Sequence, residues 1–177
     1  MKIKLLLYNL FFFCSFQATS QHKSAIDSIE LSLLQLHRDY LNIVFDDYEQ
    51  AAIKADSFTK NLIACLKLDA SLRHPFDSLK TQIRITPSID KKLRIFSWNT
   101  DIGGTWHNFV SYLQYKEGNK IKVRPLHTSS EMEKGGYTDV IYYNIQNFEH
   151  KKGRIYLLSG FGTHGAGHHH KIMRAFR

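Results

Sequence analysis

The sequence has little cysteine and little proline, and both shortages restrict what the chain can be. Only two of the 177 residues are cysteines, Cys14 and Cys65, and only three are prolines. Cys14 lies in an apolar leader that we expect to be removed, so Cys65 is left without a partner for an intramolecular disulfide. We therefore expect packing, rather than cross-links, to stabilise the fold. The few prolines exclude a proline-rich linker.

The first twenty residues have the features of a secretory signal peptide. Lys2 and Lys4 supply the positive start, and the apolar run from Leu5 to Phe16 follows. Ala18 and Ser20 are small residues of the kind that signal peptidase accepts before its cut, so we expect cleavage after Ser20. The alternative is a membrane anchor, but a spanning helix needs roughly 20 apolar residues and this run is shorter. We expect an exported protein, periplasmic, cell-surface or secreted, without a transmembrane span after cleavage.

Long blocks of like charge are also lacking. The formal net charge is +8, and two of these charges lie in the leader. Basic residues are scattered, and no block is longer than the pairs Lys91–Lys92 and Lys151–Lys152. We interpret them as a solvated surface rather than a nucleic-acid footprint. Nucleic acid is therefore not an expected partner, whereas weak attraction to anionic lipid, or binding to a cell-envelope polysaccharide or protein, stays open.

Glycine and proline are absent between residues 21 and 74. Apolar residues recur there in steps of three and four, which predicts helix: Ile26, Ile29, Leu33, Leu36, Tyr40, Val44, Tyr48, Ala51, Ala55, Phe58 and Leu62. Asp46–Asp47 with Glu49–Gln50 resembles a capping box that starts a second helix. One continuous helix would be about 65 Å long. That length favours a bend or a hairpin, although a single long helix stays open. We expect His74–Pro75 to end the helical part.

After Pro87 the pattern changes to period two with turn residues between the runs. Six strands are predicted: Leu93–Trp98, Trp106–Tyr115, Lys120–Leu126, Thr138–Phe148, Arg154–Leu158 and His169–Phe176. The segments Glu117–Lys120 and Glu149–Gly153 are typical of hairpin turns and predict antiparallel neighbours. The sequence therefore predicts an α+β fold, an N-terminal long helix or helical hairpin followed by an antiparallel β-meander. Residues 1–20 form the leader, and residues 21–177 form one domain, helical over 21–74 and β-rich over 82–177.

The segment from Leu93 to Thr100, with Gly103, Gly104 and Thr105, resembles the strand and glycine turn of uncharacterised exported bacterial proteins. In that family a helical N-terminus precedes a β-rich domain, and no activity is established. The resemblance therefore implies location and fold only. The chain stops at Arg177, inside a predicted strand, where similar proteins continue. A third hypothesis is therefore that the chain is truncated at its C-terminus and is an inactive copy of a longer protein.

Histidines are the first candidates for chemistry, because seven of the ten lie between His107 and His170. Alternate residues of a strand share a face, so His168 and His170 could present two imidazoles to zinc. His164 or His107 would supply a third ligand. The alternative is a polar, glycine-flanked hairpin that faces solvent, which the absence of an HExxH or comparable signature favours.

Other catalytic arrangements fit less well. Cys65 lies beside Leu62 and Leu66 on the apolar stripe, which predicts a buried small hydrophobe rather than a nucleophile. The glycine-rich run Gly160–Gly167 lacks the strand-to-helix setting of a phosphate-binding loop, so we interpret it as a hairpin tip. The aromatic residues of the β-rich part could stack on sugars from an open sheet face, but core positions are favoured.

We therefore expect an exported, non-catalytic binding or structural protein of unknown ligand, with no cofactor. The alternative is a metal-dependent hydrolase that holds zinc with His107, His164, His168 and His170.

Overall fold

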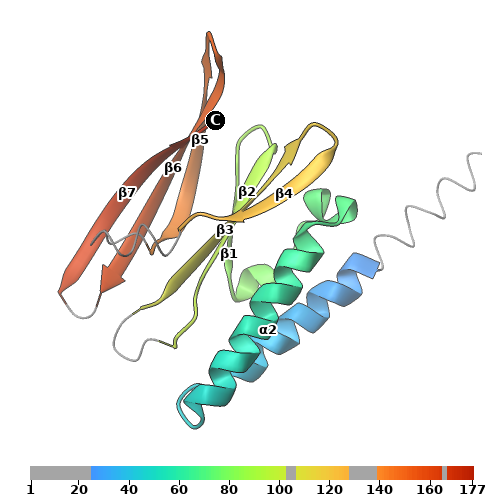
Figure 1. Cartoon of the computed structure of the whole chain (residues 1–177), viewed down its shortest axis with the longest axis vertical. Helices are drawn as coiled ribbons and strands as arrows, with labels where there is room; N and C mark the ends of the chain where they lie inside the picture. The colour runs from blue at the N-terminus through green and yellow to red at the C-terminus, as the bar shows by residue number, and fades with distance from the viewer. Residues whose placement is uncertain (1–24, 103–106, 128–138, 165–166) are drawn as a thin grey trace, which may run out of the picture.

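The chain forms two helices followed by two antiparallel sheets, so the predicted α+β class is confirmed (Figure 1). The computed structural model describes residues 25–102, 107–127, 139–164 and 167–177. The expected leader and its cleavage point lie outside these ranges. Within them, no helix has both the length and the apolar character that crossing a membrane requires.

The helical half is a hairpin rather than one long helix. The first helix covers residues 25–41, and α2 covers Tyr48–Leu66. Asp47 is the N-cap of α2, and its carboxylate accepts a hydrogen bond from the backbone N–H of Gln50 at 3.0 Å. This bond satisfies one of the N–H groups that a helix start leaves without an intrahelical partner. The acidic segment of the sequence therefore marks the turn between the two helices.

Two short 3₁₀ helices connect the hairpin to the sheets. They are η1, Asp69–Arg73, and η2, Leu79–Thr81. His74 between them has extended geometry, with ψ of 131°, as expected for a residue that precedes proline.

The β-rich half contains two meanders instead of the single one predicted. The first sheet has the order β1-β2-β3-β4, and the second has the order β5-β6-β7. All neighbouring strands are antiparallel. The strands are β1 Arg84–Pro87, β2 Leu93–Asn99, β3 Phe109–Glu117, β4 Lys120–Pro125, β5 Ile141–His150, β6 Gly153–His164 and β7 His168–Phe176. Both predicted hairpin turns are present, and Gly118 and Gly153 in them have positive φ, 58° and 114°.

Strand β1 was missed by the sequence prediction, which placed the first strand at Leu93. It has four residues and ends at Pro87, so its pattern is too short to identify by alternation. Proline lacks the N–H of a central strand, but it is tolerated here because β1 is an edge strand.

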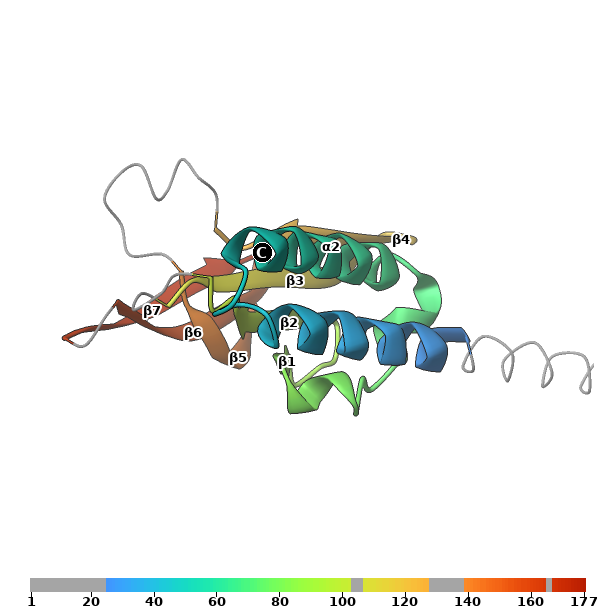
Figure 2. The same cartoon turned by 90° about the horizontal axis from the view of Figure 1, so that it is seen from below.

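The four-stranded sheet is the middle of three layers (Figure 1). Six consecutive residues of β2, Leu93 to Trp98, are buried, which requires cover on both faces. Phe96 and Trp98 belong to the core shared with the helices, while Leu93 and Ile95 belong to the core shared with the second sheet. The two helices lie side by side over the first of these faces (Figure 2).

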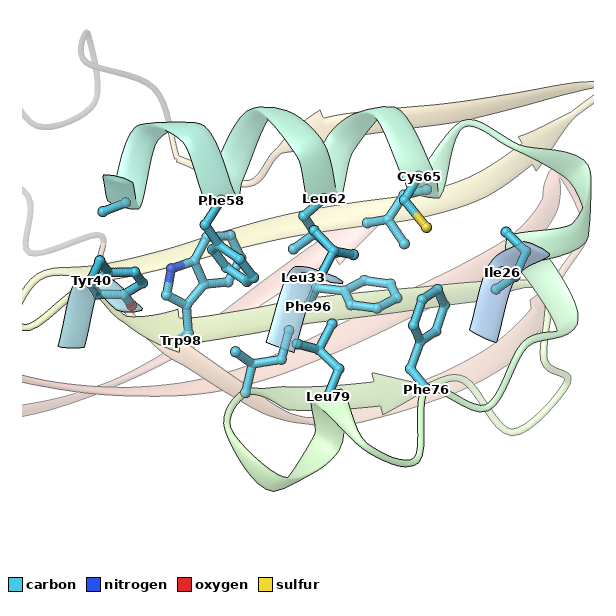
Figure 3. Packing of buried hydrophobic residues seen from close by; sticks show 13 residues of the cluster. Ile26, Leu33, Tyr40, Phe58, Leu62, Cys65, Phe76, Leu79, Phe96 and Trp98 are labelled. Atoms are coloured by element: carbon cyan, nitrogen blue, oxygen red, sulfur yellow. The ribbon is translucent and has the colours of Figure 1, made fainter. Parts of the chain in front are cut away.

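The helix-side core combines aliphatic residues with aromatic rings that meet edge-on (Figure 3). Phe58 of α2 has no exposed surface and meets the Trp98 ring edge-on, with centroids 5.4 Å apart and planes at 87°. Phe76 meets Phe96 in the same way, with centroids 5.7 Å apart. Leu33 from the first helix packs in the same cluster, so this core joins both helices to β2.

Small polar residues connect the two sheets. Ser111 donates a hydrogen bond to the Val140 carbonyl at 2.8 Å, and its Oγ lies 2.8 Å from Ser97 Oγ. Ser97 Oγ accepts the backbone N–H of Tyr142 at 3.3 Å, and Thr86 donates to the Tyr142 carbonyl at 2.8 Å. These bonds satisfy backbone groups at the start of the second sheet, which burial would otherwise leave without water.

The glycine-rich run is part of a strand over most of its length, which corrects the interpretation of Gly160–Gly167 as a hairpin tip. Strand β6 continues through Gly160 and Gly162 to His164. An added Cβ at Gly160 would lie 2.6 Å from Val140 Cγ2 and 3.0 Å from Ile172 Cγ2. This glycine is therefore present because neighbouring side chains approach the backbone closely.

Gly160→Ala is expected to lower the free energy of unfolding by about 1–3 kcal/mol, the usual cost of overpacking a core. Gly167→Ala is the matched control, because an added Cβ there meets nothing within 4 Å. Urea denaturation of both variants measures the difference. Equal stability of the two variants would show that the contact at Gly160 relaxes without cost.

Candidate anion-binding site

A pocket of about 950 Å³ lies at one end of the four-stranded sheet. It is bounded by η1, by the turn that joins β1 to β2, and by the β3–β4 turn, which lie at the same end of the sheet as the C-terminus of α2 (Figure 1). Six of its lining residues are basic, and none is aspartate or glutamate: Arg73, Lys80, Lys91, Lys92, Arg94 and Lys116. We call it the basic pocket.

The strand register gathers charges that are far apart in the sequence. Leu93 pairs with Tyr115, and Arg94 pairs with Gln114. Lys92, the residue before Leu93, is thereby brought close to Lys116, the residue after Tyr115. Like charges opposite each other on a sheet are destabilising. The proximity of Lys92 and Lys116 therefore lowers the stability of the fold.

Arg94 is the buried part of the basic pocket, with 8% of its surface exposed. Its Nη1 donates to the His74 carbonyl at 2.6 Å, and its Nη2 donates to the Ser71 carbonyl and to Gln114 Oε1. Its Nε also donates to Gln114 Oε1, at 3.1 Å. The guanidinium therefore fixes the η1 segment to the sheet.

The guanidinium is held entirely by uncharged groups within the described residues. Its acceptors are two carbonyls and an amide, and it lies over the Phe76 and Phe96 rings, with Cζ 5.4 and 5.2 Å from their centroids. Burial lowers the pKa of Arg94 to about 10, with the nearby Cys65 acting in the opposite direction. Arg94 therefore remains a cation at neutral pH, and burial of an uncompensated cation is unusual.

One N–H of Arg94 forms no hydrogen bond to a described residue. A guanidinium has five N–H groups, and four hydrogen bonds to described residues use one on Nε, one on Nη1 and two on Nη2. The remaining N–H is on Nη1, beside the segment of η1 and His74 that lines the basic pocket.

The rim of the basic pocket is exposed and mostly uncompensated. Arg73, Lys91 and Lys116 are exposed and form no ion pair within the part of the chain that the structure describes, and the same holds for Lys92. Lys80 differs, because its Nζ lies 2.9 Å from Asp77 Oδ1.

Asp90, in the turn beside the lysines, forms its ion pair with a residue outside the basic pocket. Burial raises its pKa, but hydrogen bonds from Ser88, from the Lys92 backbone N–H, from Tyr156 and from Arg154 outweigh burial and lower that pKa to about 2. The carboxylate pairs with Arg154 of the second sheet. Arg154 also pairs with Glu149, so its one positive charge is shared between two carboxylates.

Asp27, Glu30 and His74 form a second cluster, with the types of side chain that can bind a metal ion. His74 Nε2 is 2.7 Å from Asp27 Oδ1 and 3.8 Å from Glu30 Oε2, beside a pocket of about 350 Å³. His74 Nδ1 accepts the Phe76 backbone N–H at 3.2 Å, whereas a metal-bound histidine normally donates a hydrogen bond from its second nitrogen. Glu30 Oε1 likewise accepts the Leu79 N–H at 2.8 Å. These bonds indicate a structural connection between the first helix and residues 74–79.

The predicted zinc ligands lie in two places. His107 precedes β3, where its Nδ1 is 2.9 Å from Asn99 Nδ2 and its ring stacks on Phe109. His164 pairs with His168 across the β6–β7 hairpin, and the side chains of both lie outside the described residues. His170 pairs with Gly162 in the same hairpin. The backbone therefore brings three of the four positions together, and the zinc hypothesis stays a prediction.

Cys65 and three of the aromatic candidates are in the core. Cys65 is 2% exposed, and burial raises the pKa of its thiol to about 11. Trp98, Tyr142 and Tyr156 are buried, while Tyr143 is exposed. Trp106 and Tyr137, two other candidates for an open aromatic face, lie outside the described residues.

Comparison with protein families, with curated proteins and with solved structures finds no match to this chain.

The basic pocket was missed by the sequence interpretation, which took the scattered basic residues as a solvated surface. One signal could have found it. Arg94 is the only charged residue inside the run Leu93–Trp98, and a strand buried on both faces has no place for a charge without a specific partner.

Proposed function

We propose that this chain is an exported, non-catalytic binding protein that holds an anionic ligand in the basic pocket. The observation that carries the proposal is Arg94, a buried cation that forms no ion pair within the described residues. An anion beside Nη1 would supply that charge and accept the remaining N–H. Export is proposed from the leader.

The groups around the basic pocket suit holding a ligand rather than transforming it. Arginine and lysine provide charge and donors. The one hydroxyl among the lining residues, Ser88, is already used, because it donates to Asp90 Oδ1 at 2.6 Å and accepts the Leu93 N–H at 3.2 Å. It is therefore part of the turn, not an activated nucleophile.

The double variant Lys91→Gln/Lys116→Gln is expected to weaken binding of pyrophosphate by roughly tenfold, the effect of losing two exposed charge contacts. Lys54→Gln/Lys171→Gln removes the same charge from α2 and β7, away from the basic pocket, and is expected to bind as the unchanged protein does. Calorimetric titration at two salt concentrations measures both, and binding should fall as salt rises. Equal loss in the two variants would indicate attraction by net charge alone and would refute the site.

Zinc hydrolysis is the second candidate, favoured by the pairing of His164 with His168 in one hairpin. Elemental analysis of protein purified without a tag separates the two. Our proposal expects no stoichiometric zinc. Zinc at one per chain that is lost in His168→Ala/His170→Ala would favour the hydrolase and contradict a non-catalytic function.

A further inference from the structure

We infer that the ligand is a multiply phosphorylated oligomer, bound by one end, with its terminal phosphate beside Arg94. This inference rests on the proposed function and adds the chemical class of the ligand and its direction of entry. Three properties of the basic pocket support it: size, the number of uncompensated charges, and the position of the buried one.

The volume of the basic pocket exceeds that of a single inorganic anion. A pocket of about 950 Å³ lies near the upper end of the range for small-molecule sites, roughly 300–1,000 Å³. A water molecule takes about 30 Å³ of liquid, and one phosphate occupies only a few such volumes. A lone phosphate would therefore leave most of the basic pocket to solvent.

The number of cations in the basic pocket also favours a ligand with several phosphates. Arg94 and the four rim cations without an ion pair among the described residues make five: Arg73, Lys91, Lys92, Arg94 and Lys116. A phosphate monoester carries about −1.5 to −2 at neutral pH. One such group would neutralise fewer than half of these cations, whereas two or three in succession would match them.

The charges are arranged from a buried floor to an exposed rim. Arg94 is buried, while Lys91, Lys92 and Lys116 are exposed. One end of the ligand can therefore reach the floor while its later groups lie along the rim and continue into solvent. Pro75 and Pro87 also line the basic pocket and provide apolar contact for the body of the ligand.

Phosphate fits these donors better than carboxylate does. Arginine recognises a planar carboxylate best through two parallel N–H groups, and Arg94 has only one that described residues do not use. The other donors are mainly lysines, which act as point charges and suit a compact group of high charge. The terminal phosphate, with a charge of about −1.5 to −2, would also bring more charge to Arg94 than a carboxylate, which carries one.

Calorimetric titration of the full mature chain with orthophosphate, pyrophosphate, tripolyphosphate and a charge-matched oligogalacturonate tests this inference. Affinity should rise by roughly tenfold or more from orthophosphate to tripolyphosphate, because each added group binds intramolecularly once the first is held. Lys91→Gln/Lys116→Gln should weaken tripolyphosphate binding more than orthophosphate binding and so remove most of that rise. Lys54→Gln/Lys171→Gln should keep the full rise.

A long linear polyphosphate tests the direction of entry. Binding by the end predicts two protein molecules per chain whatever its length, because a linear chain has two ends. A number of bound molecules that grows with chain length would overturn end-on binding.

Different results would refute anion binding and the phosphorylated oligomer. Orthophosphate as tight as tripolyphosphate, or oligogalacturonate as tight as either, would overturn the phosphorylated oligomer and leave anion binding intact. Failure of every anion to bind would overturn the proposed function itself.

The same phosphates can be carried by a soluble oligomer or by a lipid headgroup. Co-sedimentation with phosphatidylcholine vesicles that contain phosphatidylinositol bisphosphate distinguishes these sources. Vesicle binding that tripolyphosphate displaces assigns the phosphates to a lipid. Tripolyphosphate binding without vesicle binding assigns them to a soluble oligomer.

Discussion

Arg94→Met is expected to lower the free energy of unfolding by about 2–4 kcal/mol, because methionine fills the space but donates no hydrogen bond. The carbonyls of Ser71 and His74 would lose their donor, and so would Gln114 Oε1. Gln114 also donates to the Leu66 carbonyl and to Ser71 Oγ, at 2.7 and 2.8 Å. Removing the guanidinium therefore disturbs the junction between α2, η1 and β3, not one contact alone.

Guanidinium-chloride denaturation measures this loss, and Arg38→Met is its control. Arg38 is exposed on the first helix, where a surface substitution usually changes stability by less than about 0.5 kcal/mol. Arg94→Lys should also destabilise the protein, since an ammonium cannot reproduce the fork of donors. Full stability in Arg94→Met would mean that the buried cation contributes nothing to the fold, and this part of the account would be wrong.

Phe58→Ala is expected to cost about 3–5 kcal/mol, the range found when a large aromatic residue is removed from a core. Phe58 is fully buried and contacts Trp98 and His37, with ring centroids 5.4 and 4.9 Å apart. It therefore joins α2 to both β2 and the first helix. Its loss opens a cavity where all three meet.

Phe45→Ala is the matched control for this prediction. Phe45 lies in the turn between the two helices and is 90% exposed, so its removal takes almost no apolar surface out of the core. Thermal unfolding of the two variants should differ clearly. A similar loss in both would place the stabilising contacts outside the helix-side core.

The helices were predictable from the sequence because their signal is local. An apolar stripe with steps of three and four fixes one buried face. The start of α2 is also marked locally, because Asp47 caps the helix through a residue only three positions later, Gln50. The burial of Leu33, Phe58 and Leu62 follows directly from that stripe.

The sheet arrangement was only partly predictable, because it depends on contacts between distant residues. Alternation predicted most strands, yet it could not separate one meander from two that stack. The division is visible only in the burial of β2 on both faces and in the serine contacts to Val140 and Tyr142. Strand β6 extended beyond its predicted end because Gly160 makes room for Val140, a close approach that the sequence does not reveal.

The basic pocket depends on the same long-range information. Lys91, Arg94 and Lys116 come from a turn and two strands, and only the register between β2 and β3 brings them together. Scattered charge in a sequence therefore does not imply scattered charge on the surface. For the histidines, closeness in the sequence was informative, because His164, His168 and His170 lie in one hairpin. His107, which is far from them in the sequence, lies between β2 and β3.

A crystal of the protein soaked in tungstate, a tetrahedral dianion, would locate the bound anion directly through its anomalous scattering. We expect a tungstate peak within hydrogen-bonding distance of Arg94 Nη1, flanked by Lys91, Lys92 or Lys116. Tungstate bound only at other lysines, with none beside Arg94, would contradict the claim that the basic pocket is built to hold an anion.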